Sequence, residues 1–386
     1  MPNQGTQETA GVAGLNESLL QTIVGRITDR LSAEPAAWTT TSLGSMEGNF
    51  VTGGVFRLEG PPAVPGAPAS WSLIVKRIIP DQARDEPSHY NYWRREALAY
   101  RSGLLERLPG GWRTPCCYAV EEKEDGSVWL WLEDVGIGVV DEWTEEHYAY
   151  AARRLGAFNG ACLAAGPPRK EGWLNEAWLR SWVRECRRYE PWPPPGALDH
   201  PHDDDRIERI VRRFDRLQSH LDELVEGVER LPRLLAHQDY YRNNLMLHMP
   251  QEGDPAPALT LIDWQFASLS GIGEDLGRYF GLTMSRSPLP TDQFAAMGRL
   301  LWDQYIGGLR DEGWDGDERL ARYGFTASCS VRSVWEVPKL LRWHAQMAGT
   351  ADRAHAEAKV ERLAAAAAVQ LDMAEEALAL CGALWP

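Results

Sequence analysis

Apolar residues in the first third of the chain fall mainly into short stretches with strand-like alternation, separated by turns rich in Gly and Pro. Three such stretches lie within residues 38–76 and predict three antiparallel strands. Two more strands are predicted at 116–122 and 127–134. Apolar residues at helical spacing predict one helix before the strands, at 16–31, and a second between them, at 89–108. This pattern predicts a small unit built on an antiparallel sheet.

A helical period dominates the rest of the chain, beginning with a strongly amphipathic stretch at 145–166. Only two short strands are predicted there, at 244–248 and 258–263, and everything after them reads as helix to Leu380. Residues 189–205 are rich in Pro, Asp and His, which is typical of an exposed insertion. The pattern therefore predicts an α+β, bilobal protein with a small antiparallel-sheet N-lobe and a larger, mainly helical C-lobe.

These patterns suggest three segments. Residues 1–15 are polar and Gly-rich and are expected to be disordered, 16–135 form the sheet-rich lobe, and 136–386 form the helical lobe. A length of 386 residues suits two lobes with a substantial core.

Composition narrows the function classes. The formal net charge of −15 disfavours nucleic acids and anionic membrane surfaces as partners and favours cationic small molecules. No apolar run is long enough to span a bilayer, and the start of the chain lacks the pattern of a secretory signal. The six cysteines are scattered in a way that suits neither zinc sites nor disulfides, which predicts reduced thiols in a cytoplasmic protein.

One group of residues has the pattern of phosphoryl-transfer chemistry. His237, Asp239 and Asn244 match HxDxxxxN, the catalytic-loop pattern of protein-kinase-like phosphotransferases, and Asp263 ends an apolar strand nineteen residues after Asn244. Phosphoryl transfer needs hard oxygen ligands for Mg²⁺ and a carboxylate within hydrogen-bond reach of the attacking hydroxyl. This predicts Asp239 as catalytic base, with Asn244 and Asp263 as metal ligands. His237 is expected to make a structural hydrogen bond instead.

Upstream residues supply what the same chemistry requires from the smaller lobe. Lys76 ends a β-branched strand, where a kinase-like protein carries the lysine that contacts the nucleotide phosphates, and Glu96 lies twenty residues later, suited to pair with it. The Gly-rich segment between the first two strands of 38–76 resembles a phosphate-covering loop. Its candidate nucleotide-binding residues are Gly44, Ser45, Gly48 and Asn49.

With these motifs in order, the chain from about Trp38 to Phe280 resembles the aminoglycoside phosphotransferase and choline kinase superfamily, which has a protein-kinase-like fold. The resemblance implies the roles given above, a nucleotide-binding N-lobe, and catalysis and acceptor binding in the C-lobe. It also implies a hinge at 132–135, with backbone groups around Glu133 and Val135 binding the base of ATP or GTP. Asp275 matches a family aspartate that buttresses the catalytic loop.

The sequence departs from the family pattern in the catalytic loop and the metal motif. Gln238 replaces the usual Gly, and Tyr241 stands where His or Lys is common, so the charge that assists the phosphoryl group comes from Arg242 or is absent. The metal motif reads DWQ in place of DFG. Few residues separate Asp263 from Glu274, which leaves no room for a long activation segment and favours a small-molecule kinase over a protein kinase.

The acceptor is expected to bind in the helical lobe beside Asp239. The 17 Trp and the acidic balance suit a hydroxylated amine or sugar, which favours an aminoglycoside-like or other amino-sugar antibiotic. Choline, a simple sugar or an amino alcohol remain alternatives, as do a non-catalytic pseudokinase and nucleotidyl transfer. The acidic His200–Asp205 stretch is interpreted as a solvated loop. The candidate linings are Trp192, Trp302, Asp303, Tyr305, Trp335, Glu336 and Trp343.

Overall fold

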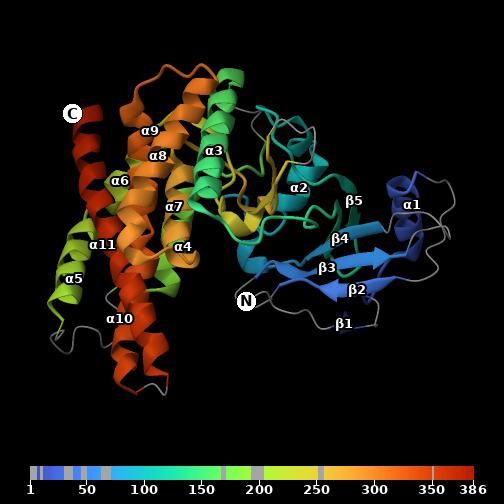
Figure 1. Ribbon diagram of the computed structural model, residues 1–386, viewed down its shortest axis with the longest axis horizontal. Helices are drawn as coiled ribbons and strands as arrows, with labels where there is room; N and C mark the ends of the chain where they lie inside the picture. Colours follow the sequence, from blue (N-terminus) through green and yellow to red (C-terminus); the bar gives the residue numbers. More distant parts are fainter. Residues whose placement is uncertain are drawn as a thin grey trace.

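The computed structural model has two lobes, one built on a sheet and one mainly helical, as predicted (Figure 1). The sheet lobe is formed by the first third of the chain, and helix α5 (Asp205–Gln218) and the C-terminal half of α11 (Arg353–Leu384) lie far from it. The structure describes residues 7–8, 12–29, 38–44, 50–61, 71–166, 171–192, 204–250, 256–349 and 352–386.

The N-lobe is a six-stranded antiparallel sheet in the order β1-β2-β3-β4-β6-β5. Its strands are β1 (Gln7–Glu8), β2 (Thr39–Ser42), β3 (Thr52–Gly60), β4 (Trp71–Ile78), β5 (Cys117–Glu122) and β6 (Val128–Glu133). The predicted strands are all present. Residues 1–15 were expected to be disordered, but two of them form β1, which pairs with β2 at Thr40 and Thr41. The other residues up to 11 lie outside the described residues.

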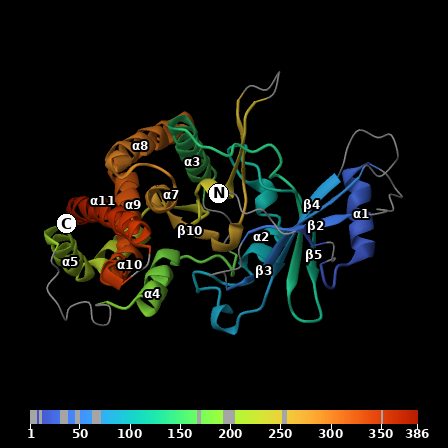
Figure 2. The same cartoon turned by 60° about the horizontal axis from the view of Figure 1, so that its bottom comes forward.

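Alternation along the strands separates the two faces of this sheet. Trp129 and Trp131 of β6 pack in one core cluster with α1 (Glu17–Ile27), whereas Leu130 and Leu132 belong to the core shared with the C-lobe. Figure 2 shows α1 on the outer side of the sheet and α2 on the side that faces the helical lobe. Lys76 is opposite Leu130 in the β4–β6 register, so it lies on the inner face.

The second helix, α2 (Arg95–Arg101), is much shorter than the predicted 89–108. Arg95 explains its late start, because this side chain is fully buried and donates to the carbonyls of Pro87, His89 and Tyr90 at 2.7, 2.8 and 2.7 Å. These bonds hold the aromatic segment before the helix as a turn. Burial lowers the pKa of Arg95 to about 9. The segment 87–94 therefore folds around a single cation instead of continuing the helix.

The C-lobe packs nine helices among the described residues around two small two-stranded sheets. The helices are α3 (Glu145–Ala165), α4 (Trp178–Tyr189), α5 (Asp205–Gln218), α6 (Leu221–Glu229), α7 (Glu274–Arg286), α8 (Phe294–Asp311), α9 (Glu318–Val331), α10 (Ser333–Gln346) and α11 (Arg353–Leu384). Within the described ranges, no helix combines the length and apolarity needed to cross a bilayer. All six cysteines are free thiols.

Both short predicted strands are present as β8 (Leu245–His248) and β9 (Ala258–Leu261), which pair with each other. The prediction that only helix follows residue 263 is wrong at β10 (Ser268–Gly271), which pairs with β7 (Arg233–Ala236). All four residues of β10 are buried. The strand was missed because four residues with one large apolar side chain, Leu269, are too short a run to show a strand pattern, and pairing with β7 makes the segment a strand.

The close packing of α3 against α8 depends on glycine. A Cβ atom at Gly308 would come within 2.0 Å of the Arg153 carbonyl oxygen, whereas one at the neighbouring Gly307 would meet only the flexible end of the Arg153 side chain. We expect Gly308→Ala to lower the free energy of unfolding by about 1–3 kcal/mol through overpacking. Gly307→Ala is the matched control and should be neutral or stabilising, because Ala favours helix. Thermal unfolding of both variants measures this, and equal destabilisation would contradict it.

Candidate active site

Three elements bring a lysine and two carboxylates together between the lobes. Lys76 of β4 places Nζ 2.6 Å from Oε2 of Glu96, on α2, and 2.8 Å from Oδ1 of Asp263, which follows β9. Lys76 is 7% exposed, and burial alone would lower its pKa, but Asp263 and Glu96 raise the pKa above its usual value. The lysine is therefore charged and fixed in position, as contact with nucleotide phosphates requires.

Buried hydrogen bonds shape the loop that carries Asp239. Gln238 has φ of 62°, a left-handed conformation that favours glycine. Its side chain offsets the strain, because Nε2 donates to Ser270 Oγ at 2.7 Å and to Glu274 Oε2 at 3.0 Å. The predicted structural role of His237 matches its contacts, since Nδ1 accepts from the Asp239 N–H at 3.2 Å and Nε2 lies 2.9 Å from the Ile262 carbonyl.

Asp275, in the first turn of α7, holds this loop through two hydrogen bonds. Its two carboxylate oxygens accept the backbone N–H groups of His237 and Gln238 at 2.8 and 2.6 Å. The carboxylate is 1% exposed, and burial raises its pKa to about 6 although both hydrogen bonds oppose the rise. Asp275 thus fixes the turn immediately before Asp239.

Asp239 is held in one orientation and remains accessible. Its Oδ1 accepts from Arg278 Nη2 at 3.1 Å and its Oδ2 accepts from Asn244 Nδ2 at 3.0 Å. The side chain is 15% exposed and lines a cavity of about 510 Å³ between the lobes. A carboxylate in this setting can accept a proton from a hydroxyl group that enters the cavity.

Asn244 and Asp263 form a donor set that suits Mg²⁺. The Asn244 amide also donates to the Asp239 carbonyl at 2.9 Å, so both its N–H groups face Asp239 and its oxygen faces away. The backbone N–H of Ile262 donates to the backbone carbonyl of Asn244 at 3.0 Å. This bond holds Asn244 beside the residue that precedes Asp263. Among the described residues no three His, Cys, Asp or Glu side chains form a metal cluster. One carboxylate and one amide fit Mg²⁺ that is also bound by nucleotide phosphates.

The turn that carries Asp263 is locked by Trp264. Asp263 has φ of 64°, and the Trp264 N–H that follows donates to Glu96 Oε1 at 3.3 Å. The indole is fully buried, donates to the Leu261 carbonyl at 3.3 Å, and packs edge-on against His237 with ring centroids 4.8 Å apart. The turn is therefore part of the core.

A second cavity, of about 240 Å³, lies under the sheet and shares Asp263 with the first. Lys76, Glu96, Glu133 and Val135 all line it, with apolar walls from Ile74, Leu132, Met246 and Ile262. An apolar slot that ends at a charged lysine suits a purine nucleotide. The sequence did not reveal Arg57, which also lines this cavity and pairs with the buried Asp134 at 2.7 Å.

The Gly-rich segment is described only at its start. Gly44 has φ of 82° and the preceding Leu43 lines the 240 Å³ cavity, which is consistent with a turn above the nucleotide. The other predicted residues of this loop, Ser45, Gly48 and Asn49, lie outside the described residues.

Most predicted acceptor-binding residues lie elsewhere, and only Trp335 lines the 510 Å³ cavity. Tyr305 is a core residue whose hydroxyl donates to Asn159 at 2.7 Å, and Trp302 stacks on Phe325 with ring centroids 5.9 Å apart. The remaining four also have other roles: Trp192 bonds to Asp215, Trp343 packs on His355, Asp303 is exposed on α8, and Glu336 pairs with Arg332. A large Trp count cannot separate packing residues from binding residues.

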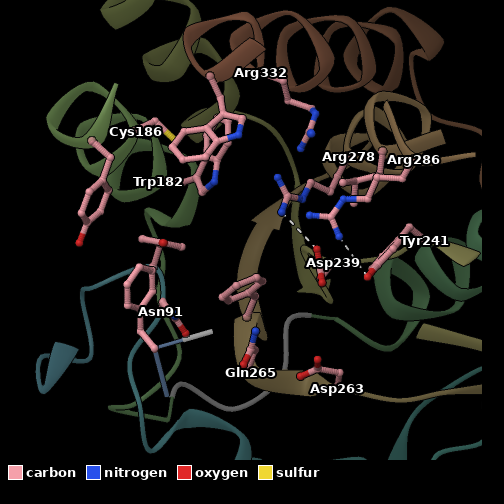
Figure 3. A pocket seen from close by; sticks show the side chains of 16 residues that line it. Asn91, Trp182, Cys186, Asp239, Tyr241, Asp263, Gln265, Arg278, Arg286 and Arg332 are labelled. Atoms are coloured by element: carbon pink, nitrogen blue, oxygen red, sulfur yellow. Dashed lines mark hydrogen bonds and ion pairs between the residues drawn. The ribbon is translucent and has the colours of Figure 1, made fainter. Parts of the chain in front are cut away.

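One wall of this cavity is formed by arginines, whereas acidic residues were predicted there (Figure 3). Arg278, Arg286 and Arg332 reach into it from the helical lobe, facing aromatic side chains such as Trp182. The predicted Arg242 lines a different, small hollow beside Tyr148. Arg278 could have been anticipated, because it lies three residues after Asp275 and therefore on the same side of a helix.

Glu274, next to Asp275, makes stability depend on pH. Burial raises the pKa of Glu274 from 4.5 to about 7. Because the folded state binds this proton more tightly, the free energy of unfolding is highest below pH 4.5 and falls as the pH rises to about 7, by up to about 3 kcal/mol. Denaturant unfolding at pH 5 and pH 8 measures the fall. Glu274→Gln should flatten the fall between pH 5 and 7, and an unchanged slope in that range would contradict the assignment.

The chain is similar in sequence to one protein family and in fold to several solved structures. Residues 94–314, more than half of the chain, match the family model described as "APH: Phosphotransferase enzyme family". A sequence search of curated proteins finds no match. The solved structure of amicoumacin kinase hAmiN, in complex with AMP-PNP, Ca²⁺ and Ami, is 14% identical with a TM-score of 0.51, covering 87% of this chain and 88% of that one. This similarity concerns the fold.

Two other solved structures are similar at lower scores. An aminoglycoside phosphotransferase from Alicyclobacillus acidocaldarius is 14% identical with a TM-score of 0.46, covering 86% of this chain and 90% of that one. A choline/ethanolamine kinase family protein from Mesorhizobium loti is 15% identical with a TM-score of 0.41, covering 85% of this chain and 91% of that one.

Proposed function

Because this chain belongs to the phosphotransferase enzyme family, we propose that it moves the γ-phosphate of ATP or GTP to a hydroxyl of a small molecule, with Mg²⁺ as cofactor. The observation that carries this proposal is the position of Asp263, which lines both cavities and bonds to Lys76. A nucleotide in the smaller cavity would present its terminal phosphate there, beside Asp239 at the edge of the larger one.

Each residue of the site then has a defined task. The backbone around Glu133 and Val135 holds the base, and Lys76, oriented by Glu96, holds the phosphates. Asn244 and Asp263 would hold Mg²⁺, which supplies charge neutralisation on the phosphates when bound. Asp239 orients the hydroxyl of the acceptor and takes its proton as the new O–P bond forms and the bond from the γ-phosphorus to the bridging oxygen breaks. The nucleoside diphosphate is the leaving group. The barrier is lowered mainly by positioning and electrostatics.

An aminoglycoside-like or other amino-sugar antibiotic is the acceptor class proposed from sequence, with choline, a sugar or an amino alcohol as alternatives. The family and the size of the 510 Å³ cavity support a small molecule in general. The charges of the cavity point to a narrower class, considered below.

An acceptor screen tests the proposed function. The full chain is incubated with ATP or GTP and Mg²⁺ and with a panel that includes amino sugars, sugars, amino alcohols, hydroxy acids and sugar phosphates, and products are analysed by mass spectrometry. We expect one class to gain a phosphate. Nucleotide binding by calorimetry without turnover of any acceptor would support a pseudokinase, and a nucleotide adduct would indicate nucleotidyl transfer.

A further inference from the structure

The larger cavity has more positive than negative side chains in its lining. Its charged residues are Asp239 and Asp263 on one side, and Arg278, Arg286 and Arg332 on the other. Asp263 is already paired with Lys76, and Asp239 with Arg278. The carboxylates in the cavity are therefore balanced without Arg286 and Arg332.

Arg332 is a buried cation with few partners. It is 5% exposed, and its only ion pair among the described residues joins Nη2 to Glu336 at 3.1 Å. Its Nε and Nη1 have no hydrogen-bond partner in the described part of the chain. A guanidinium group has five N–H donors, and leaving them unused in a buried place is costly. This arrangement indicates that a further acceptor group belongs beside Arg332.

Arg286 is the cation of this cavity that has no carboxylate partner among the described residues. No carboxylate of the described residues lies within ion-pair distance of it, and its one side-chain bond is from Nη1 to the Tyr241 hydroxyl at 3.3 Å. Its side chain is exposed, and it lies eight residues after Arg278 on α7. Burial lowers the pKa of Arg278 to about 10, and the charges of Arg332 and Arg286 contribute to this fall, so the three cations are close neighbours.

We infer that Arg286 and Arg332 form a subsite for an anionic group of the acceptor, a carboxylate or a phosphate. This inference rests on the proposed function and names its substrate class. Guanidinium groups bind both anions through paired N–H donors. A purely cationic acceptor would meet like charges at this wall, whereas an anion would satisfy them. The acceptor is then a compact hydroxy acid or phosphorylated hydroxy compound, with its hydroxyl at Asp239 and its anion at the arginine wall.

The aromatic side chains opposite the arginines complete the subsite. The ring centroid of Trp182 lies 5.5 Å from the guanidinium carbon of Arg278 and 5.9 Å from that of Arg332, so both cations contact this ring. Trp335 also lines the cavity and offers an apolar surface to the body of the acceptor.

Binding of inorganic phosphate tests the subsite independently of turnover. Calorimetry is performed on the full chain saturated with Mg²⁺ and AMP-PNP, so that the nucleotide site is occupied. We expect saturable binding of phosphate that weakens about ten- to hundredfold in Arg286→Gln, the loss of one charged hydrogen-bonding group. Arg353→Gln, which removes an exposed charge from α11 outside both cavities, is the control. Absence of saturable binding, or equal binding by Arg286→Gln, would overturn the inference.

Arg332 needs a double variant, because removing it alone would leave Glu336 buried and unpaired. Arg332→Gln with Glu336→Gln keeps the charge balance and should weaken phosphate binding to a similar extent. Circular dichroism and thermal unfolding establish whether it folds. If it does not, Arg286→Gln alone decides the result.

Kinetics separates this inference from the proposed function. With an anionic acceptor found in the screen, Arg286→Gln should raise the acceptor KM about tenfold or more with little change in kcat. A fall in kcat with unchanged KM would assign the arginines to the transferring phosphate and overturn the subsite. Turnover confined to neutral or cationic acceptors would also overturn it. Phosphate binding without turnover of any acceptor would leave the subsite standing and refute the transferase.

Discussion

Replacing Asp239 by Asn is expected to reduce kcat by about 10²–10⁴-fold while nucleotide binding persists, because the variant lacks the group that accepts the proton of the hydroxyl. Asn is nearly isosteric and can still accept a hydrogen bond from Arg278 or Asn244. The positions of the metal ligands should therefore change little. Turnover with a saturating acceptor and calorimetry with AMP-PNP and Mg²⁺ measure the two effects separately.

Two measurements distinguish a specific loss of catalysis in Asp239→Asn from a general loss of structure. Asp303→Asn makes the same chemical change at an exposed position of α8 outside both cavities and should retain full activity. The unfolding temperature of Asp239→Asn shows how much the lost ion pair with Arg278 costs. Full turnover by a folded Asp239→Asn protein would refute the assigned role.

The second large effect is expected from Asp275→Ala. This substitution leaves the backbone N–H groups of His237 and Gln238 buried without an acceptor. Each such group costs about 1–3 kcal/mol, so the free energy of unfolding should fall by about 2–6 kcal/mol. The catalytic loop should also lose its fixed conformation, and kcat should fall with it. Denaturant unfolding and steady-state kinetics measure both losses.

Asp275→Asn distinguishes the role of the acceptor atoms from that of the volume. Asn retains one oxygen, which can accept one of the two N–H groups, so the stability loss should be roughly half that of Asp275→Ala. A stability loss confined to Asp275→Ala, with Asp275→Asn as stable as the parent protein, would show that the volume of the side chain, and not the pair of hydrogen bonds, holds the loop.

Much of the nucleotide side of the site could be predicted from local sequence. The inner position of Lys76 follows from the alternation of a β-strand, and the neighbourhood of Asp239 and Asn244 follows from their separation by five residues. The position of Asp263 required only that two short strands pair as a hairpin, which β8 and β9 do. Such relations depend on the local chain and on one sheet register.

The acceptor side could not be predicted in the same way. Arg286 lies on α7, whereas Arg332 lies between α9 and α10, and only helix packing brings their side chains to one wall. Net charge could not reveal this wall, because a protein of −15 overall can still have a cavity wall lined by cations. Composition also failed for the aromatic residues. Tyr305 was predicted to line the acceptor site but is buried in the core, and an aromatic count is the same whether such a residue packs or binds.

The locked turn at Asp263 has a consequence for inhibition. Rotating Asp263 outward would pull a fully buried indole from the core and break its contact with His237. We expect compounds that need such a rearranged turn to bind poorly, whereas compounds that mimic the purine in its assembled slot should compete well. An inhibitor selective for this protein would then have to contact other residues that line the same cavity, such as the ion pair between Arg57 and Asp134.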